Sequence, residues 1–309
     1  MKKIDITGYS GFIGKNLLKS KYFKKFILNK INLREKKTIS VDSFAVIHLA
    51  GIAHDLSNKY SYNDYIEINY NLTKSIFNEF LKSKSEIFIL LSSAKAVRDN
   101  YDKIITENTP PKPKTSYGIS KLKAERYIQI KIPKYKNKRI YILRACMIHG
   151  PKNKGNLNAL FNFINNGIPW PLGSYKNSRS YLSIENLNFI FNELIINKNI
   201  CSGIYNISDN NTLSTNEIIH LIKKETGGKN LILPIPKIII YLIFSFFGII
   251  KTKYNLNMLK KLTNNYVVDN NKIIKAINKN LPIDVEEGMI KTLNFLNKKS
   301  WCSTVLFTY

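Results

Sequence analysis

The chain has 309 residues, of which 44% are hydrophobic and 12% are aromatic. This composition predicts a globular protein with a sizeable core and excludes a disordered chain. The formal net charge is +27, from 48 Lys and Arg against 21 Asp and Glu. Because the lysines are spread along the whole chain and no nucleic-acid recognition motif accompanies them, we expect a basic surface and no nucleic-acid partner.

The sulfur and imidazole side chains point to no disulfide framework and no metal centre. Cys146, Cys201 and Cys302 lie far apart without CxxC spacing, and the four histidines are scattered. This pattern fits a reducing compartment. The N-terminal Met1–Lys3 runs directly into an apolar strand rather than a signal sequence, so we expect a cytoplasmic protein.

The first predicted strand, Lys3–Thr7, is followed by a glycine-rich turn with the sequence GYSGFIG. A helix is expected to begin at about Phe12. Such a turn between a strand and a helix lets backbone N–H groups face a pyrophosphate. The residues expected to bind a dinucleotide here are Gly8, Gly11, Phe12, Ile13 and Gly14.

Further strands alternate with helical segments through the first half of the chain. The predicted strands are Lys25–Leu28, Ala45–Leu49, Ile87–Leu91 and Ile140–Leu143, with helical periodicity over Tyr65–Lys82. This alternation predicts an α/β fold with a Rossmann-type doubly wound parallel sheet. The third strand ends in small residues beside which a cofactor can lie, so Leu49, Ala50 and Gly51 are also expected to bind it.

The choice between NAD and NADP stays open. An NAD site usually has an acidic residue about 20 positions after the glycines. Here Asn29 and Asn32 occupy that region, and Arg34, Lys36 and Lys37 follow. These basic side chains could hold a 2′-phosphate or could be ordinary surface residues, so NAD is expected and NADP is not excluded.

Two segments carry the residues suited to chemistry. Ser92 and Ser93 end the Ile87–Leu91 strand, at the edge where ligands bind. Tyr117 and Lys121 are four residues apart in TSYGISKLKAE and would share one helix face. A nearby ammonium favours the phenolate, so Tyr117 could exchange a proton with a sugar hydroxyl while a nicotinamide exchanges a hydride.

From TGYSGFIG through LSSAKAV and SYGISK to RACMIHGPKNKGN and RSYLSIENL, the chain resembles the extended short-chain dehydrogenases/reductases. It is most similar to the NAD-dependent epimerase/dehydratase group that acts on nucleotide sugars in surface-polysaccharide synthesis. The resemblance implies that Ser93, Tyr117 and Lys121 are the catalytic residues. It also places Asn69, in IEINYNLT, near the cofactor and the active site.

The same resemblance limits the reaction type. Sugar 4,6-dehydratases of this family carry an Asp-Glu pair after the serine or threonine, where this chain has Ala94 and Lys95. Dehydration is therefore not expected. Epimerisation at C4 of a UDP-linked hexose or N-acetylhexosamine remains, with 4-keto-reduction as the alternative. A non-catalytic dinucleotide-binding regulator is a remote third hypothesis, because pure binding needs no Tyr–Lys pair.

The second half is expected to bind the substrate. The predicted division is residues 1–150 for the dinucleotide, 151–299 mostly for the substrate with some segments returning to the first domain, and 300–309 as a tail without assigned role. By resemblance, Asn156 and Arg179 hold the nucleotide diphosphate, and Ser93 contacts the sugar. The alternative for Arg179 is a surface ion pair with a residue such as Glu185.

Three further features concern architecture. Ser202–Ile207 predicts a strand, and Ser214 with Glu217 predicts a capping box at a helix start. The uncharged run from Ile238 to Ile250 is shorter than a membrane span. We expect it to form a buried helix, with a membrane-surface helix as the alternative. The resemblance also implies a homodimer.

Overall fold

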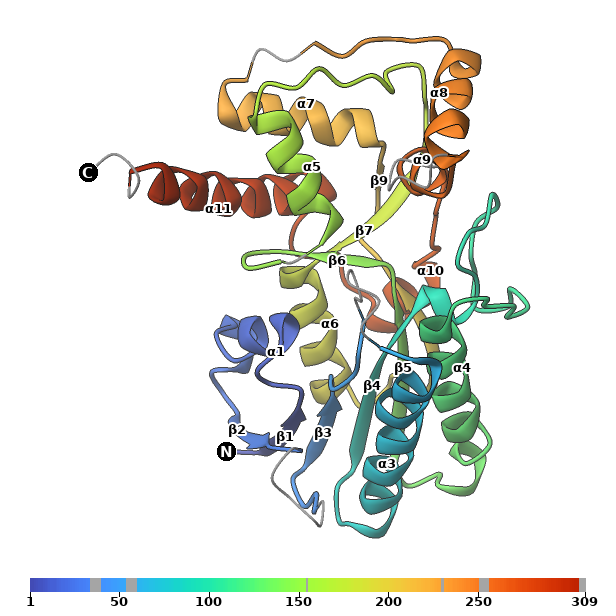
Figure 1. Ribbon diagram of the computed structural model, residues 1–309. Coiled ribbons are helices and arrows are strands. Elements are labelled where there is room, and N and C mark those ends of the chain that lie inside the picture. The colour runs from blue at the N-terminus through green and yellow to red at the C-terminus, as the bar shows by residue number, and fades with distance from the viewer. Residues whose placement is uncertain (34–39, 54–59, 154, 229–230, 250–255, 306–309) are drawn as a thin grey trace.

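The centre of the molecule is a six-stranded parallel sheet (Figure 1). The computed structural model describes residues 1–33, 40–53, 60–153, 155–228, 231–249 and 256–305. In spatial order the strands are β2 (Ile27–Ile31), β1 (Lys3–Thr7), β3 (Ala45–His48), β4 (Ile87–Ser93), β5 (Arg139–Ala145) and β8 (Gly203–Ile207). The predicted doubly wound α/β fold is therefore confirmed.

The strand order reverses beside β1. The chain passes from β1 to β2 on one side and then returns to place β3 on the other, with Thr7 opposite His48 at the carboxyl ends. In open α/β sheets, ligands bind in the crevice at such a reversal. The glycine-rich turn follows β1, and the segment from Leu49 to Gly51 follows β3, so both lie at this crevice.

Helices cover both faces of the sheet (Figure 1). Along β4, Ile87 and Ile89 point into one core, whereas Phe88 and Leu90 point into the other, which is why the strand is continuously apolar. The first core includes residues of α1 (Phe12–Leu17), α6 (Ile184–Ile196) and α10 (Asn271–Ile277). The second includes residues of α3 (Leu72–Lys82) and α4 (Ser116–Gln129).

The second lobe has its own small sheet and core. Its strands are β6 (Met147–His149), β7 (Arg179–Ser183) and β9 (Thr212–Leu213). Its helices are α5 (Asn156–Asn165), α7 (Thr215–Thr226), α8 (Lys237–Ile249), α9 (Leu256–Thr263) and α11 (Val285–Val305). All five helices contribute to one apolar core. Between these elements in sequence, α6, β8 and α10 pack with the large sheet. The chain therefore crosses between the lobes several times.

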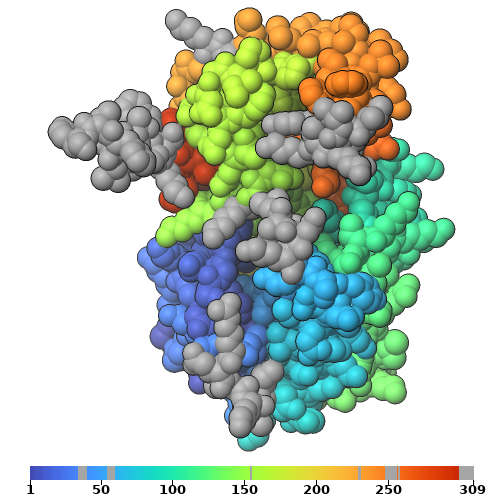
Figure 2. Space-filling model, in the orientation of Figure 1, coloured from blue at the N-terminus to red at the C-terminus, as the bar shows by residue number. Residues whose placement is uncertain are grey.

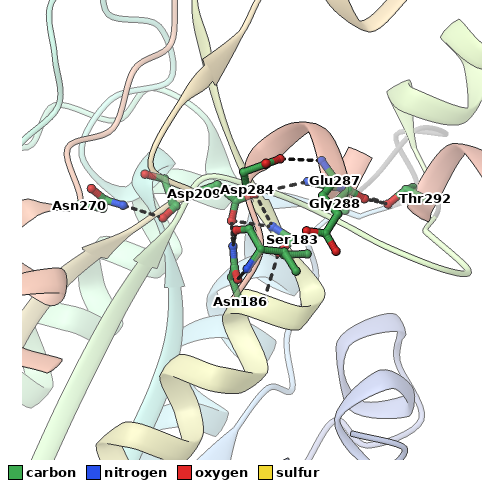
Figure 3. A network of polar contacts seen from close by, with 11 residues as sticks. Ser183, Asn186, Asp209, Asn270, Asp284, Glu287, Gly288 and Thr292 are labelled. Atoms are coloured by element: carbon green, nitrogen blue, oxygen red, sulfur yellow. Dashed lines mark hydrogen bonds and ion pairs between the residues drawn. The ribbon is translucent and has the colours of Figure 1, made fainter. Parts of the chain in front are cut away.

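A buried polar network fastens the two lobes together (Figure 3). The Asp209 carboxylate accepts from the Ser183 backbone N–H at 3.0 Å and from Asn186 Nδ2 at 2.7 Å. Asn186 also accepts from and donates to the backbone of Ile283. A Cβ on Gly288 would lie 2.8 Å from that of Ser183, so α11 approaches the start of α6 closely. The two lobes therefore share a tightly packed junction.

Most predicted elements are confirmed, with small shifts in their ends. The helix expected over Tyr65–Lys82 starts earlier, as α2 (Tyr62–Tyr65), and contains a π-helical turn at Ile66–Asn71. The capping box of Ser214 with Glu217 is present at the start of α7. The strand expected over Lys25–Leu28 is displaced, because Phe26 N–H closes a turn onto the carbonyl of Phe23 before β2 begins.

One prediction in the second half was wrong. Residues 238–249 of the apolar run lie in α8, yet this helix is not buried, because most of its large apolar side chains are exposed. In the tail, residues 300–305 continue α11, which ends at Val305. The remaining short helices are 3-10 turns at Lys21–Phe23, Ala94–Ala96 and Ile132–Lys134.

Candidate active site

The glycine-rich turn packs directly against the end of β3. Gly8 has a φ of +67°, and a Cβ there would lie 2.6 Å from the backbone nitrogen of Ala50. A Cβ on Gly14 would lie 2.6 Å from the carbonyl oxygen of Gly8. Gly11 donates to that same carbonyl at 3.1 Å and is the N-cap of α1 without a capping side chain. Only glycine fits at Gly8 and Gly14, and the backbone at the start of α1 faces the crevice.

The predicted cofactor residues after β3 are held close to the catalytic helix. The hydroxyl of Thr7 accepts from the backbone N–H groups of Leu49 and Ala50 at 3.2 and 3.3 Å. A Cβ on Gly51 would meet Asn69 Oδ1 at 2.7 Å and Lys121 Nζ at 3.2 Å. The structure therefore brings together the loop after β3, Asn69 and the lysine of α4.

Asn69 lies in the π-helical turn and is fully buried. Its Oδ1 accepts from the backbone N–H of Ile52 at 2.9 Å, and its Nδ2 donates to the Ile52 carbonyl and to Ser120 Oγ. These bonds tie the loop after β3 to α4. Asn69 therefore fixes the position of the loop after β3 relative to α4.

Ser93, Tyr117 and Lys121 converge at the carboxyl edge of the sheet. Ser93 is the last residue of β4 and is hydrogen-bonded to the side chain of Tyr117. Lys121, one turn after Tyr117 on α4, is only 6% exposed and donates to the carbonyl of Leu91 at 3.2 Å. The side chain of Thr115 caps α4 and is itself bound by Asp99, which fixes where the helix begins.

Burial dominates the pKa values of Tyr117 and Lys121. Burial raises the pKa of Tyr117 above 10.0, although the hydrogen bond from Ser93 opposes it. Burial also lowers the pKa of Lys121 from 10.5 to about 8, with Glu125 opposing. The sequence suggested that the ammonium would favour a phenolate. In this structure burial outweighs that effect, and the ammonium is directed at the Leu91 carbonyl.

A buried ion pair supports this face of α4. Arg144 donates from Nε and Nη2 to Glu125 Oε2, at 3.0 and 2.8 Å, and both side chains are almost completely buried. The other oxygen of Glu125 accepts from Ser92 Oγ. Glu125 is one turn after Lys121, so the network joins β4, α4 and β5 next to this lysine.

Arg179 belongs to the second lobe, at the start of β7. Its guanidinium donates to the carbonyls of Lys261 and Asn264 at 2.9 and 3.1 Å, at the end of α9. The surface ion pair of Arg179 with Glu185, which was the alternative prediction, is not formed. Glu185 binds Lys21 and Lys291 instead.

Positive charges from both lobes meet near Ser93. Lys95 lies two residues after Ser93, in the 3-10 turn, and is exposed. Partial removal of its ammonium from water lowers the pKa of Lys95, and repulsion from Lys261 and Arg179 lowers it further. Attraction to Asp99 opposes this decrease. The structure therefore brings Arg179 close enough to Lys95 for the two charges to repel each other.

The other predicted substrate residue, Asn156, lies at an exposed helix start. Asn156 is the first residue of α5, its side chain is exposed, and Gly155 before it has a φ of +142°. Its role stays a prediction. Among the described residues there is no group of three or more His, Cys, Asp or Glu that could hold a metal.

Sequence reasoning missed several residues of the site. The ring of Tyr65 packs edge-on against Tyr117, with the ring centres 6.4 Å apart. Tyr266 comes from the second lobe and donates from its hydroxyl to the carbonyl of Arg98, close to the serine loop. Neither tyrosine lies in a recognisable motif. Lys95 could have been noticed from its place in SSAKAV, where dehydratases carry a carboxylate.

The glycine turn at the strand-order reversal, with a Ser–Tyr–Lys set beside it, defines an extended short-chain dehydrogenase/reductase. The family model "NAD dependent epimerase/dehydratase family" matches residues 27–208, more than half of the chain. The chain therefore belongs to the NAD-dependent epimerase/dehydratase family.

Two curated proteins are similar to this chain in sequence, and one solved structure is similar to it in fold. A UDP-glucose 4-epimerase of Vibrio cholerae is 26% identical, over 94% of both chains. An Escherichia coli 4-epimerase of N-acetylglucosaminyl-diphospho-undecaprenol is 26% identical, over 72% of both chains. The solved structure of UDP-glucuronic acid 4-epimerase from Bacillus cereus in complex with NAD has the same fold, with a TM-score of 0.71 and 18% identity, and covers 96% of this chain and 99% of that chain.

Proposed function

We propose that this protein is an NAD(P)-dependent 4-epimerase of a nucleotide-activated sugar, a UDP-hexose or a UDP-N-acetylhexosamine. The observation that carries the proposal is the convergence of Ser93, Tyr117 and Lys121 beside the glycine turn. The 4-epimerases among its relatives support the reaction.

The residues at the sheet crevice fit a dinucleotide. Gly8 and Gly14 lie so close to neighbouring backbone that no side chain fits at either position. A tight turn without side chains allows a pyrophosphate to approach the backbone N–H groups. Gly51 lies next to Lys121, so the lysine is placed to reach a ribose there. A bound NAD would supply the hydride acceptor and donor for C4 of the sugar and would add positive charge to the site.

The chain's own residues manage the proton on the sugar 4-hydroxyl. Tyr117 removes the proton from this oxygen and later returns it, and Ser93 holds the same oxygen by a hydrogen bond. Because burial raises the pKa of Tyr117, the phenolate forms only when positive charge is close to it. Lys121 provides such a charge when it is protonated, and its pKa near 8 makes this pH-dependent.

The second lobe binds the diphosphate. Arg179 is the predicted anchor, and Lys95 and Lys261 add positive charge around it. A guanidinium held rigidly by two carbonyls is well suited to phosphate oxygens. Asn156 is assigned to the same substrate lobe. UDP-sugars and the diphospholipid-linked sugar of the Escherichia coli relative share this diphosphate.

The alternative is a 4-keto-reductase that uses exchangeable NAD(P)H. On β2, the side-chain amide of Asn29 donates to the Asp5 carboxylate at 2.6 Å. Asn29 therefore stabilises the sheet and does not replace the acidic residue that binds the ribose in NAD sites. Arg34, Lys36 and Lys37, the residues expected to favour NADP, lie outside the described part of the chain. The cofactor content of the purified protein separates the two activities, since an epimerase retains NAD and a reductase exchanges it.

The catalytic assignment is tested by comparing Tyr117→Phe with Tyr127→Phe. Both tyrosines lie on α4, but the hydroxyl of Tyr127 donates to Asn78 away from the site. We expect Tyr117→Phe to lower turnover by several orders of magnitude while cofactor binding is retained, and Tyr127→Phe to have little effect. Equal turnover of the two variants would refute the assignment.

A further inference from the structure

The second lobe carries an unusual concentration of exposed apolar side chains. Seven large apolar residues of α8 are at least 37% exposed: Ile238, Ile239, Tyr241, Leu242, Ile243, Phe246 and Phe247. The helix contacts the lobe mainly through Ile240, which is 2% exposed, and the partly buried Phe244. In Figure 2, α8 belongs to the orange region at the top of the molecule, far from the blue N-terminal residues.

Charge around this helix has one sign. From Thr226 to Val268 the sequence contains no Asp or Glu, whereas it contains the lysines Lys229, Lys237, Lys251, Lys253, Lys260 and Lys261. Among the described ones, Lys237 begins α8 and Lys260 lies in the last turn of α9, and both are exposed. An apolar face bordered by ammonium groups is complementary to acyl chains beneath anionic headgroups.

The length of α8 fits a helix that lies on a membrane. Its 13 residues extend about 20 Å at 1.5 Å per residue, less than the roughly 30 Å of a bilayer core. No helix among the described residues is long and apolar enough to cross a membrane. Aromatic side chains such as Tyr241 and Phe246 are enriched at the membrane interface.

We propose that the outer face of α8 docks the protein on an anionic lipid surface. The apolar side chains enter the headgroup–acyl boundary, and the lysines at the ends of the helix pair remain at the level of the phosphates. Through α9, which packs on α8, this face is joined to Arg179 in the cleft. The docking is independent of the reaction proposed above.

The test is co-sedimentation of the purified full chain with vesicles. We expect binding to a two-to-one mixture of phosphatidylcholine and phosphatidylglycerol, weaker binding at high salt, and little binding to phosphatidylcholine alone. The double variant Leu242→Ser/Phe246→Ser should lower the partition coefficient by about a hundredfold or more, at about tenfold or more for each apolar side chain. The matched control is Ile104→Ser/Ile130→Ser, since these residues are 57% and 72% exposed away from α8.

Several results would overturn the proposal. One is no binding of the wild type to the anionic vesicles, and another is equal loss of binding in the test and control variants. A third is self-association in solution that Leu242→Ser/Phe246→Ser abolishes, without vesicle binding by the wild type. That result would assign the face to a second copy of the chain. Circular dichroism checks that both double variants fold, as exposed positions should allow.

Discussion

Replacing Lys121 by Met should stabilise the protein while removing its catalytic function. The pKa of Lys121 is about 8 in the folded protein and 10.5 for a free side chain. At about 1.4 kcal/mol per pKa unit, the buried ammonium lowers the free energy of unfolding by about 3 kcal/mol at neutral pH. Loss of the hydrogen bond to the Leu91 carbonyl costs the variant about 1 kcal/mol. The free energy of unfolding of Lys121→Met should therefore exceed that of the wild type by about 2 kcal/mol.

The gain has a defined pH dependence. Below pH 8 the lysine is charged in both the folded and the unfolded chain, and the full cost of burial applies. Between about pH 8 and 10.5 the unfolded chain binds more protons than the folded one, so wild-type stability rises with pH. The advantage of Lys121→Met should therefore shrink across this range and disappear above it.

Urea denaturation of the cofactor-free protein at several pH values measures this effect. Lys123→Met is the matched control, because Lys123 lies on the exposed side of the same helix and its loss should change stability little at any pH. A Lys121→Met variant that is no more stable than the wild type at pH 7, or whose advantage does not depend on pH, would refute the reasoning.

Two further stability differences follow from the packing around the site. Arg144→Met leaves the buried carboxylate of Glu125 without its ionic partner and should lower the free energy of unfolding by about 3–5 kcal/mol. In the same denaturation assay, Lys82→Met, which breaks a solvent-exposed pair, should have no measurable effect. Gly8→Ala should abolish cofactor binding in a calorimetric titration and destabilise the fold more than Gly227→Ala. Both glycines have a φ near +67°, but only at Gly8 does the added methyl meet backbone.

Local patterns were sufficient to predict the sheet and the proximity of Ser93, Tyr117 and Lys121. The run Ile87–Leu91 is apolar at every position because both faces of β4 are covered, and such a run identifies a central parallel strand. The Tyr117–Lys121 spacing determines one helix face, and the serines at the end of β4 meet it once the sheet forms. These features depend on neighbours in sequence or on the general topology of parallel sheets.

Features that depend on distant contacts could not be predicted. The pKa of Tyr117 is set by burial in the folded site rather than by the lysine one turn away. Arg179 is bound by carbonyls of residues more than 80 positions later, which no local pattern reveals. An apolar run such as α8 indicates a helix but does not tell whether its outer face is covered by protein.

The central claim is tested most directly with UDP-glucose and UDP-N-acetylglucosamine that carry deuterium at C4. The purified protein is incubated with each sugar without added reductant, and the products are examined by NMR spectroscopy and mass spectrometry. The account predicts the C4 epimer with deuterium retained at C4, because the hydride leaves and returns at the same carbon. Absence of any epimer, together with turnover of a 4-keto sugar only when NADPH is supplied, would contradict it.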